Sequence, residues 1–158
     1  MMKYVTDAVT FEEIPLEVTL SLTISNCCGT CHGCHSPELR EDIGTELTPG
    51  VLDSLIRKNE GITCVLFLGE GNCSSSLRAM AERVRNHWGL KVALYSGRVS
   101  VEPSLASCFD YIKVGPYIEA LGPLNKVTTN QRLYQYSPFF SEPGGWRNIT
   151  DLFWKHRE

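Results

Sequence analysis

Apolar and polar residues follow one another along the chain in patterns that predict four strands. Residues 16–24 alternate apolar with polar side chains and are rich in strand-forming types, which predicts a strand. Residues 62–68 form a nearly continuous apolar run, which is typical of a strand buried on both faces of a parallel sheet. Shorter runs at 91–95 and 110–114 predict two further strands, the last ended by a Gly-Pro pair.

Two helical patterns separate these strands. Thr48 followed by Pro49 is typical of a helix N-terminus, and apolar residues then recur at helical spacing up to a stop at Gly61. Residues 74–88 show the same spacing and end before Gly89. Because strands and helices alternate, the chain is predicted to be an α/β protein with right-handed crossovers and a parallel sheet.

Length and composition are those of one soluble domain. With 158 residues, 42% of them hydrophobic and 21% charged, the chain can bury one core, so we treat 1–158 as a single domain. Its longest apolar run is far shorter than a bilayer span and its N-terminus shows no apolar signal core, so we expect a cytoplasmic protein that does not enter the membrane. A net charge of −3 without a basic stripe argues against nucleic acid as a partner.

The strongest chemical signal is a group of cysteines directly after the first predicted strand. Cys27, Cys31 and Cys34 have the spacing C-x3-C-x2-C, and thiolates so close in sequence can converge on one metal centre. Soft sulfur ligands select zinc or the iron of an iron–sulfur cluster. Seven cysteines in a chain without an export signal favour metal ligation over disulfides. The group follows the carboxyl end of a strand, where α/β sheets place their sites.

Two alternatives stay open at these cysteines. A zinc ion completed to four ligands by His32, His35 or Cys28 would make the chain a non-catalytic zinc-binding module. Cys28 also forms a C-x2-C pair with Cys31, so it competes with Cys27 for a place among the ligands.

The spacing of the three cysteines resembles the signature of radical S-adenosylmethionine (SAM) enzymes, in which three cysteines hold a 4Fe-4S cluster whose fourth iron binds SAM. Residues 31–39, with the sequence C-H-G-C-H-S-P-E-L, further resemble the activating proteins of anaerobic ribonucleoside-triphosphate reductases. Ser36 stands where that family has asparagine. The resemblance implies a shortened, incomplete (βα) barrel of the radical SAM type, with a mostly parallel sheet.

The same resemblance implies the function. It implies an oxidoreductase, a glycyl-radical activating enzyme, that cleaves SAM reductively and removes hydrogen from a glycine of an anaerobic ribonucleoside-triphosphate reductase. The implied cofactors are the 4Fe-4S cluster and SAM, and the implied electron donor is a flavodoxin or ferredoxin. Another glycyl-radical enzyme as the protein substrate is the alternative within this class. An incomplete barrel suits either substrate because its open side admits a loop of another protein.

Residues at the ends of the predicted strands match the places where the superfamily binds SAM. Gly69 and Glu70 stand where it carries a Gly-Gly-Glu-like turn that binds the SAM ammonium group, with Leu68 in place of the first glycine. Glycine allows a close approach of the backbone, and a carboxylate pairs with an ammonium group through a charge-assisted bond. An ordinary strand-to-helix turn is the alternative here. The resemblance and strand ends together predict these SAM contacts: Gly33, Cys34, His35, Gly69, Glu70 and Ser96.

Three further features of the sequence carry expectations, and two of these have an alternative. Lys113 is either a plain strand terminus or a partner for a carboxylate. Residues 115–136 are expected to help dock the protein substrate, whereas the alternative is that residues 130–133 complete the sheet. The remaining cysteines, Cys64, Cys73 and Cys108, are expected to be buried small apolar residues.

Overall fold

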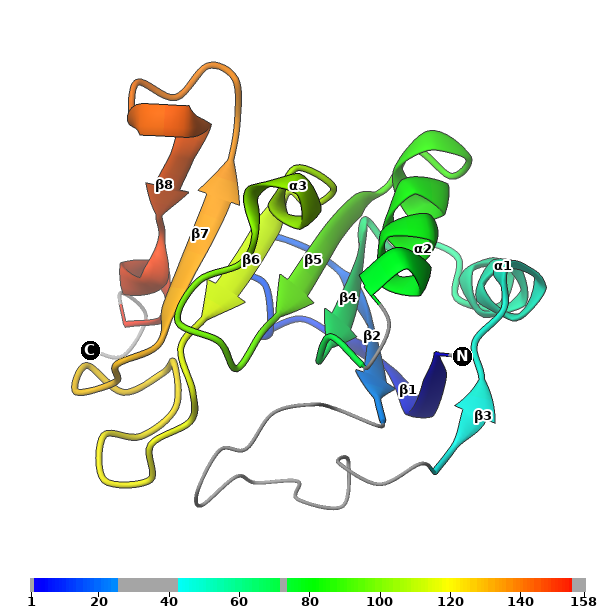
Figure 1. Ribbon diagram of the computed structural model, residues 1–158, viewed down its shortest axis with the longest axis horizontal. Coiled ribbons are helices and arrows are strands. Elements are labelled where there is room, and N and C mark those ends of the chain that lie inside the picture. The colour runs from blue at the N-terminus through cyan, green and yellow to red at the C-terminus, as the bar shows by residue number, and fades with distance from the viewer. Residues whose placement is uncertain (1, 26–42, 72–73, 155–158) are drawn as a thin grey trace.

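One eight-stranded sheet organises the computed structural model, which describes residues 2–25, 43–71 and 74–154 (Figure 1). The strands are β1 (Lys3–Thr10), β2 (Thr19–Ile24), β3 (Thr45–Glu46), β4 (Cys64–Leu68), β5 (Lys91–Tyr95), β6 (Tyr111–Val114), β7 (Arg132–Tyr136) and β8 (Trp146–Asn148), and their order across the sheet is β3-β1-β2-β4-β5-β6-β7-β8. The α-helices in the described residues are α1 (Pro49–Lys58), α2 (Ser74–Asn86) and α3 (Pro103–Ala106), and the 3-10 helices there are η2 (Pro143–Gly145) and η3 (Thr150–Phe153).

The centre of the sheet is parallel and its flanks are antiparallel. Strands β2, β4, β5 and β6 pair in parallel, which confirms the predicted α/β fold and the parallel arrangement of these four strands. The prediction of a mostly parallel sheet is wrong for the flanks, because β1 pairs with β2 and β3, and β7 with β6 and β8, all antiparallel. The protein is therefore an α/β protein with a mixed sheet.

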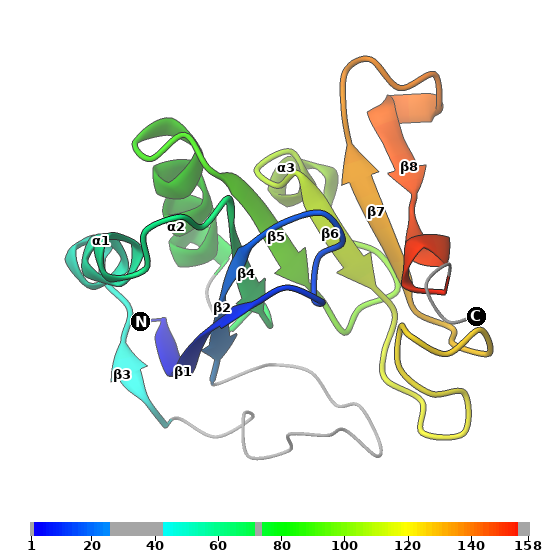
Figure 2. The same ribbon diagram turned by 180° about the vertical axis from the view of Figure 1, so that it is seen from behind.

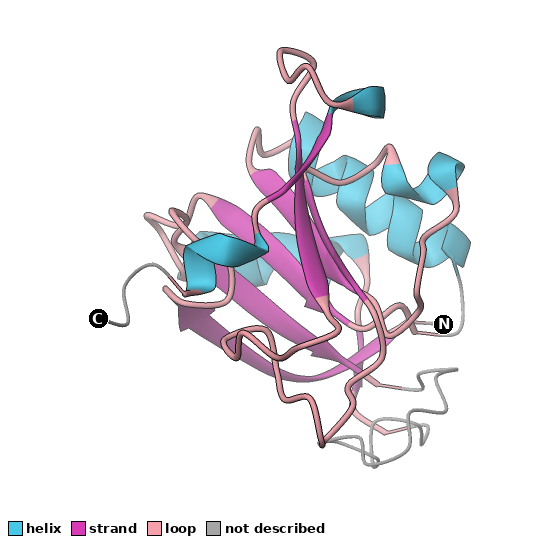
Figure 3. Ribbon diagram, turned by 90° about the vertical axis from the view of Figure 1, so that its left-hand side faces the viewer, coloured by secondary structure: helices cyan, strands magenta, loops and turns pink. Residues whose placement is uncertain are grey.

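The two long helices begin as the sequence predicts. The Thr48 hydroxyl accepts a hydrogen bond from the Val51 N–H (3.2 Å) and caps α1, which then ends at Lys58, before the predicted stop at Gly61. Helix α2 ends at Asn86. Figure 3 shows both helices on the same side of the sheet. In the part of the chain that the structure describes, no helix is long and apolar enough to cross a membrane.

Apolar side chains are buried on both faces of the sheet. The face toward the helices carries the larger cluster, which includes Leu20, Leu22, Val65, Phe67, Leu52, Leu55, Leu77 and Val84. The opposite face carries a second cluster of Ile14, Cys64, Leu66, Ala93, Tyr111, Leu124, Leu133 and Ile149. Burial on both faces explains why β4 reads as a continuous apolar run.

The connection between β1 and β2 covers part of the face opposite the helices, as the view from behind shows (Figure 2). Ile14 in this connection is fully buried. The Tyr95 hydroxyl donates to the Glu13 carbonyl, and the Tyr111 hydroxyl donates to the Glu17 carboxylate (2.7 Å). The connection is therefore fixed to the end of β5 and the start of β6, and it covers part of this face of the sheet.

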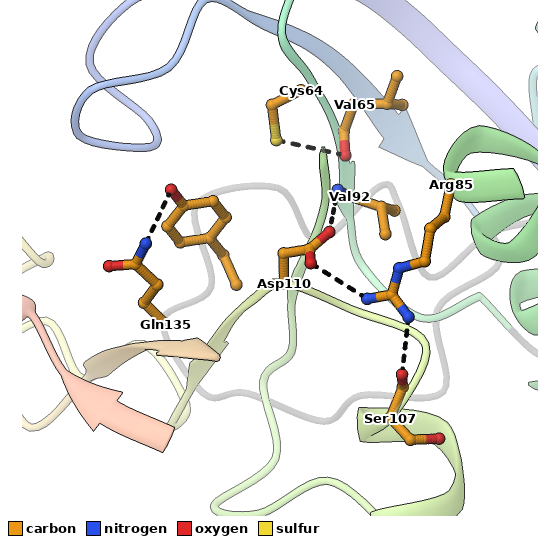
Figure 4. A network of polar contacts seen from close by, with 8 residues as sticks. Cys64, Val65, Arg85, Val92, Ser107, Asp110 and Gln135 are labelled. Atoms are coloured by element: carbon orange, nitrogen blue, oxygen red, sulfur yellow. Dashed lines mark hydrogen bonds and ion pairs between the residues drawn. The ribbon is translucent and has the colours of Figure 1, made fainter. Parts of the chain in front are cut away.

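Asp110 joins β5, β6 and α2 at the amino end of the sheet (Figure 4). Its carboxylate accepts hydrogen bonds from the Val92 N–H (3.0 Å) and from the Arg85 guanidinium (3.3 Å), and Arg85 also donates to the Ser107 carbonyl (2.9 Å). The sequence predicted a strand over 110–114, and the structure begins β6 one residue later, at Tyr111.

Asp53 joins α1 to α2. Its carboxylate, largely buried, accepts hydrogen bonds from Arg83 at both oxygens (3.0 and 2.6 Å) and from the Trp88 indole (2.9 Å). The hydrogen bonds from Arg83 are the largest cause that lowers the Asp53 pKa from 3.8 to about 2, against the opposing effect of burial.

We expect this carboxylate to contribute to acid sensitivity. A pKa that is lower in the folded than in the unfolded state stabilises the fold above pH 3.8, and this stabilisation is lost as the pH falls through about 2. Urea unfolding between pH 5 and pH 2 should therefore show a shallower loss of stability for Asp53→Asn than for the unsubstituted protein. Parallel curves for the two proteins would show that Asp53 does not contribute in this range.

Candidate functional site

The carboxyl ends of the parallel strands lie together at one edge of the sheet, the lower edge in Figure 1. Here β2 ends before Ser25, β4 ends before Gly69, and β5 ends before Ser96. Because β4 and β5 are neighbours in the sheet, the turns that follow these two strands lie side by side, next to the end of β2. The structure thus brings the predicted site residues Gly69, Glu70 and Ser96 to one place.

The turn after β4 requires its glycines. Gly69 has a φ of +113° and Gly71 a φ of +67°, values that side-chain-bearing residues rarely adopt. The Gly69 N–H donates to the Tyr95 carbonyl (3.0 Å), which ties the turn to β5. A side chain at Gly71 would place its Cβ 3.3 Å from the Ile24 side chain, so this turn also lies against the end of β2.

Ser96 fixes the orientation of the Glu70 carboxylate. The Ser96 side chain is fully buried, and its hydroxyl donates to Glu70 Oε2 (2.6 Å) while accepting from the Arg98 N–H (3.1 Å). The Arg98 Nε lies 3.2 Å from the same Glu70 Oε2, in an ion pair. One carboxylate oxygen therefore has two close partners, and among the described residues no hydrogen bond or ion pair engages the other oxygen.

Arg98 is a member of this site that the sequence analysis missed. Its backbone is held in place because the Gly115 N–H donates to the Arg98 carbonyl (2.6 Å), but its side chain is 67% exposed. The Glu70 side chain is 18% exposed. The only available signal was a basic residue two positions after Ser96 in a loop that follows a parallel strand, and sequence alone does not fix the path of such a loop.

The predicted cluster ligands Cys27, Cys31 and Cys34 lie outside the described residues, as do the predicted SAM contacts Gly33 and His35. The chain on either side of them is described. The Ser25 hydroxyl donates to the Ile43 carbonyl, and the Ser25 N–H donates to the Lys3 carbonyl (3.1 Å). The chain thus departs from the carboxyl edge at Ser25 and is described again at Ile43 beside it.

Metal ligands are not grouped elsewhere in the described ranges. Within residues 2–25, 43–71 and 74–154, no group of three His, Cys, Asp or Glu side chains lies close enough to hold a metal ion. Cys64 and Cys108 are buried, which confirms their predicted role as small apolar residues, and burial raises the pKa of the Cys64 thiol. Cys73 lies outside the described residues.

Lys113 is nearly buried on β6, and its ammonium group lies 5.4 Å from the centre of the Tyr95 ring. This is the geometry of a cation–π contact. The alternative role of Lys113, pairing with a carboxylate, stays a prediction.

Residues 130–133 lead into β7 and complete the sheet. Leu133 is fully buried opposite Lys113 in the strand pairing. The Arg132 guanidinium donates to the carbonyls of Thr129 and Gln131 (both 2.7 Å), so it braces its own segment. The structure confirms the sheet-completing interpretation of this segment, and docking of a partner here stays a prediction.

The fold and this edge together define an α/β protein with an acidic and a basic side chain side by side at the carboxyl end of its parallel strands. Comparison with family models, with curated proteins and with solved structures gave no significant match. The functional proposal therefore depends on the sequence motif and on the described edge of the sheet.

Proposed function

We propose that this protein is a radical SAM enzyme that activates a glycyl-radical enzyme, with an anaerobic ribonucleoside-triphosphate reductase as its protein substrate. The observation that carries the proposal is the position of Glu70. Its carboxylate lies in the turn after β4, and that turn contacts the end of β2, one residue before the segment that bears the cysteine motif. A carboxylate that could bind the ammonium group thus lies beside the end of the strand that precedes the cysteine motif in the sequence.

The described residues fit the SAM ammonium group. Glu70 has one oxygen held by Ser96 and the other turned to no described partner, so it can accept a charge-assisted hydrogen bond without first losing its orientation. Gly69 permits the tight turn that presents this carboxylate. Ser96 orients Glu70, and its predicted contact with SAM stays part of the proposal.

Under this proposal Cys27, Cys31 and Cys34 hold the cluster, with Gly33 and His35 beside SAM. The bound cluster would supply the electron for SAM cleavage, which yields methionine and a 5′-deoxyadenosyl radical. That radical takes a hydrogen atom from the glycine Cα, so the products are 5′-deoxyadenosine and a glycyl radical. A flavodoxin or ferredoxin would return one electron for each turnover.

The proposal also includes an incomplete barrel that is open to a macromolecule. Among the strands that the structure describes, only β2, β4, β5 and β6 run parallel, and antiparallel strands flank them on both sides. Four parallel strands are half the number in a closed (βα)8 barrel. A glycine loop of the reductase would then reach Glu70 from the carboxyl edge, with residues 115–136 contributing to docking.

The experiment is anaerobic activation. Reduced protein, SAM and the candidate reductase are mixed, and the glycyl radical is measured by electron paramagnetic resonance. We expect the radical on the reductase and one 5′-deoxyadenosine for each radical formed. SAM cleavage without a glycyl radical on the reductase would assign a different glycyl-radical enzyme as the substrate. A colourless protein that contains zinc and no iron would instead assign the non-catalytic zinc module.

A further inference from the structure

We propose that the end of the β7–β8 hairpin, residues 136–147, is a docking surface for the body of the protein substrate, separate from the edge of the sheet that receives its glycine. We call these residues the hairpin tip. The inference rests on the proposed function, because the occupant that it names is the glycyl-radical enzyme. It adds a second point of attachment, with Phe139 as the residue that enters the partner.

Aromatic side chains gather on the hairpin tip, and the most exposed of them lies outside the core. Phe139 is 94% exposed, the highest value among the exposed large hydrophobic residues that the structure describes. Tyr136 is 38% exposed, and its ring lies 5.4 Å from the ring of Trp146, the residue paired with it across the two strands. Large aromatic side chains and arginine are the types that dominate the binding energy of protein interfaces. The hairpin tip therefore has the composition of an interface.

Hydrogen bonds within the hairpin tip hold it in one shape. The Ser137 N–H donates to the Gly145 carbonyl (2.9 Å), and the Phe140 N–H donates to the Ser137 carbonyl (3.2 Å). The Ser137 hydroxyl accepts from the Phe139 N–H (3.2 Å). Gly145 has a φ of +80°, and a Cβ there would lie 2.9 Å from the Tyr136 ring, so the ring packs directly on this backbone. An aromatic ring on a preformed turn loses little conformational freedom when a partner buries it.

The charges of the hairpin tip neutralise each other, so this surface suits an apolar partner. Glu142 and Arg147 are the only charged residues in 136–147. Their Oε2 and Nε atoms form an ion pair at 2.7 Å, and the Arg147 guanidinium lies 3.8 Å from the centre of the Phe140 ring. Nucleic acids and anionic membranes require a basic patch, which the hairpin tip does not provide. A protein with an apolar pocket for Phe139 is the occupant that fits.

The position of the hairpin tip favours the body of the glycyl-radical enzyme as this protein. Strand β7 belongs to the segment 115–136, which is predicted to dock the protein substrate, and it leads directly into the hairpin tip. Figures 1 and 3 show the tip at the end of the sheet opposite to the carboxyl ends of the parallel strands, where Glu70 lies. The five residues of β7 span about 17 Å, so a partner that contacts both places has to be larger than a glycine loop. Attachment at two points raises the effective concentration of that loop at the site.

A single exposed phenylalanine without any function is the competing explanation, because isolated exposed apolar residues are common in soluble proteins. The chain contains a matched example in Phe11, which is 69% exposed and directly follows β1. Strand β1 lies near the opposite end of the strand order from β8. Phe11 therefore provides a control with the same side chain on a distant surface.

The test measures how tightly the intact candidate reductase binds. It is titrated by anaerobic calorimetry into the cluster-containing protein and into Phe139→Ser, Phe139→Leu and Phe11→Ser. We expect Phe139→Ser to weaken binding about ten- to a hundred-fold, the effect of losing one buried phenylalanine side chain. Phe139→Leu should retain part of the affinity because it stays apolar, and Phe11→Ser should bind normally. SAM cleavage without the reductase should be equal in all these proteins, because the hairpin tip lies away from Glu70.

Each contrary outcome overturns the inference. Unchanged binding by Phe139→Ser would mean that Phe139 has no part in docking, and equal weakening by Phe11→Ser would mean that any exposed phenylalanine has this effect. A dimer in sedimentation of the protein alone that is lost in Phe139→Ser would assign a second copy of the chain as the occupant.

The glycyl radical tests the proposed function separately. A protein that binds the reductase through Phe139 and forms no radical on it would keep the inference and contradict the proposed activation. Radical formation on the reductase, with full affinity in Phe139→Ser, would keep the proposed function and contradict the inference. If the unsubstituted protein does not bind the reductase, the inference and the partner assignment fail together.

Discussion

Replacing Cys27, Cys31 or Cys34 by alanine should abolish the bound 4Fe-4S cluster and, with it, all SAM cleavage. Each cysteine thiolate is the protein ligand of one iron of the cluster, and the predicted ligand set contains no spare cysteine. Iron and sulfide analysis of the anaerobically purified variants, together with their visible absorption, measures the loss.

Cys28→Ala is the matched control for this prediction. It removes a thiol from the same segment and should retain most of the iron, because the C-x3-C-x2-C spacing uses Cys27. Loss of the cluster in Cys28→Ala with retention in Cys27→Ala would assign Cys28 as the first ligand. Retention of iron in Cys31→Ala and Cys34→Ala would contradict the cluster proposal as a whole.

Glu70→Ala should weaken SAM binding by roughly ten- to a hundred-fold. A hydrogen bond to a charged group contributes about 1.5–3 kcal/mol, which corresponds to this range of affinity. The substitution also removes the acceptor of the Ser96 hydroxyl, so a folded-state check by circular dichroism belongs to the measurement. Glu142→Ala, which removes the exposed partner of Arg147, should bind SAM with unchanged affinity. Unchanged SAM affinity in Glu70→Ala would show that another group of the site binds the ammonium.

The parallel centre of the fold could be predicted because burial on two faces leaves a direct trace in the sequence. The run that forms β4 is buried at nearly every position, and the sequence shows it as continuous apolar residues. Strand β1 leaves no such trace. Its residues from Val5 to Val9 are all exposed, so buried and exposed positions do not alternate there. Strand β7 depends on pairing with β6, a contact between distant segments that local patterning does not encode.

The candidate site likewise has residues that the sequence predicted and one that it did not. Gly69, Glu70 and Ser96 follow predicted parallel strands, so strand order alone was enough to bring them together. Arg98 is placed by the bonds from Ser96 and Gly115, which depend on how the loop after β5 returns toward β6. Such tertiary contacts are not periodic in sequence, and this is why the basic member of the site emerged only from the structure.

The hydrogen bond between Ser25 and Ile43 closes the chain just outside residues 26–42. Bringing two distant points of a chain together costs conformational entropy. Because the fold already holds Ser25 and Ile43 together, a metal centre bound by the cysteines between them in the sequence would not have to bring these two ends together itself.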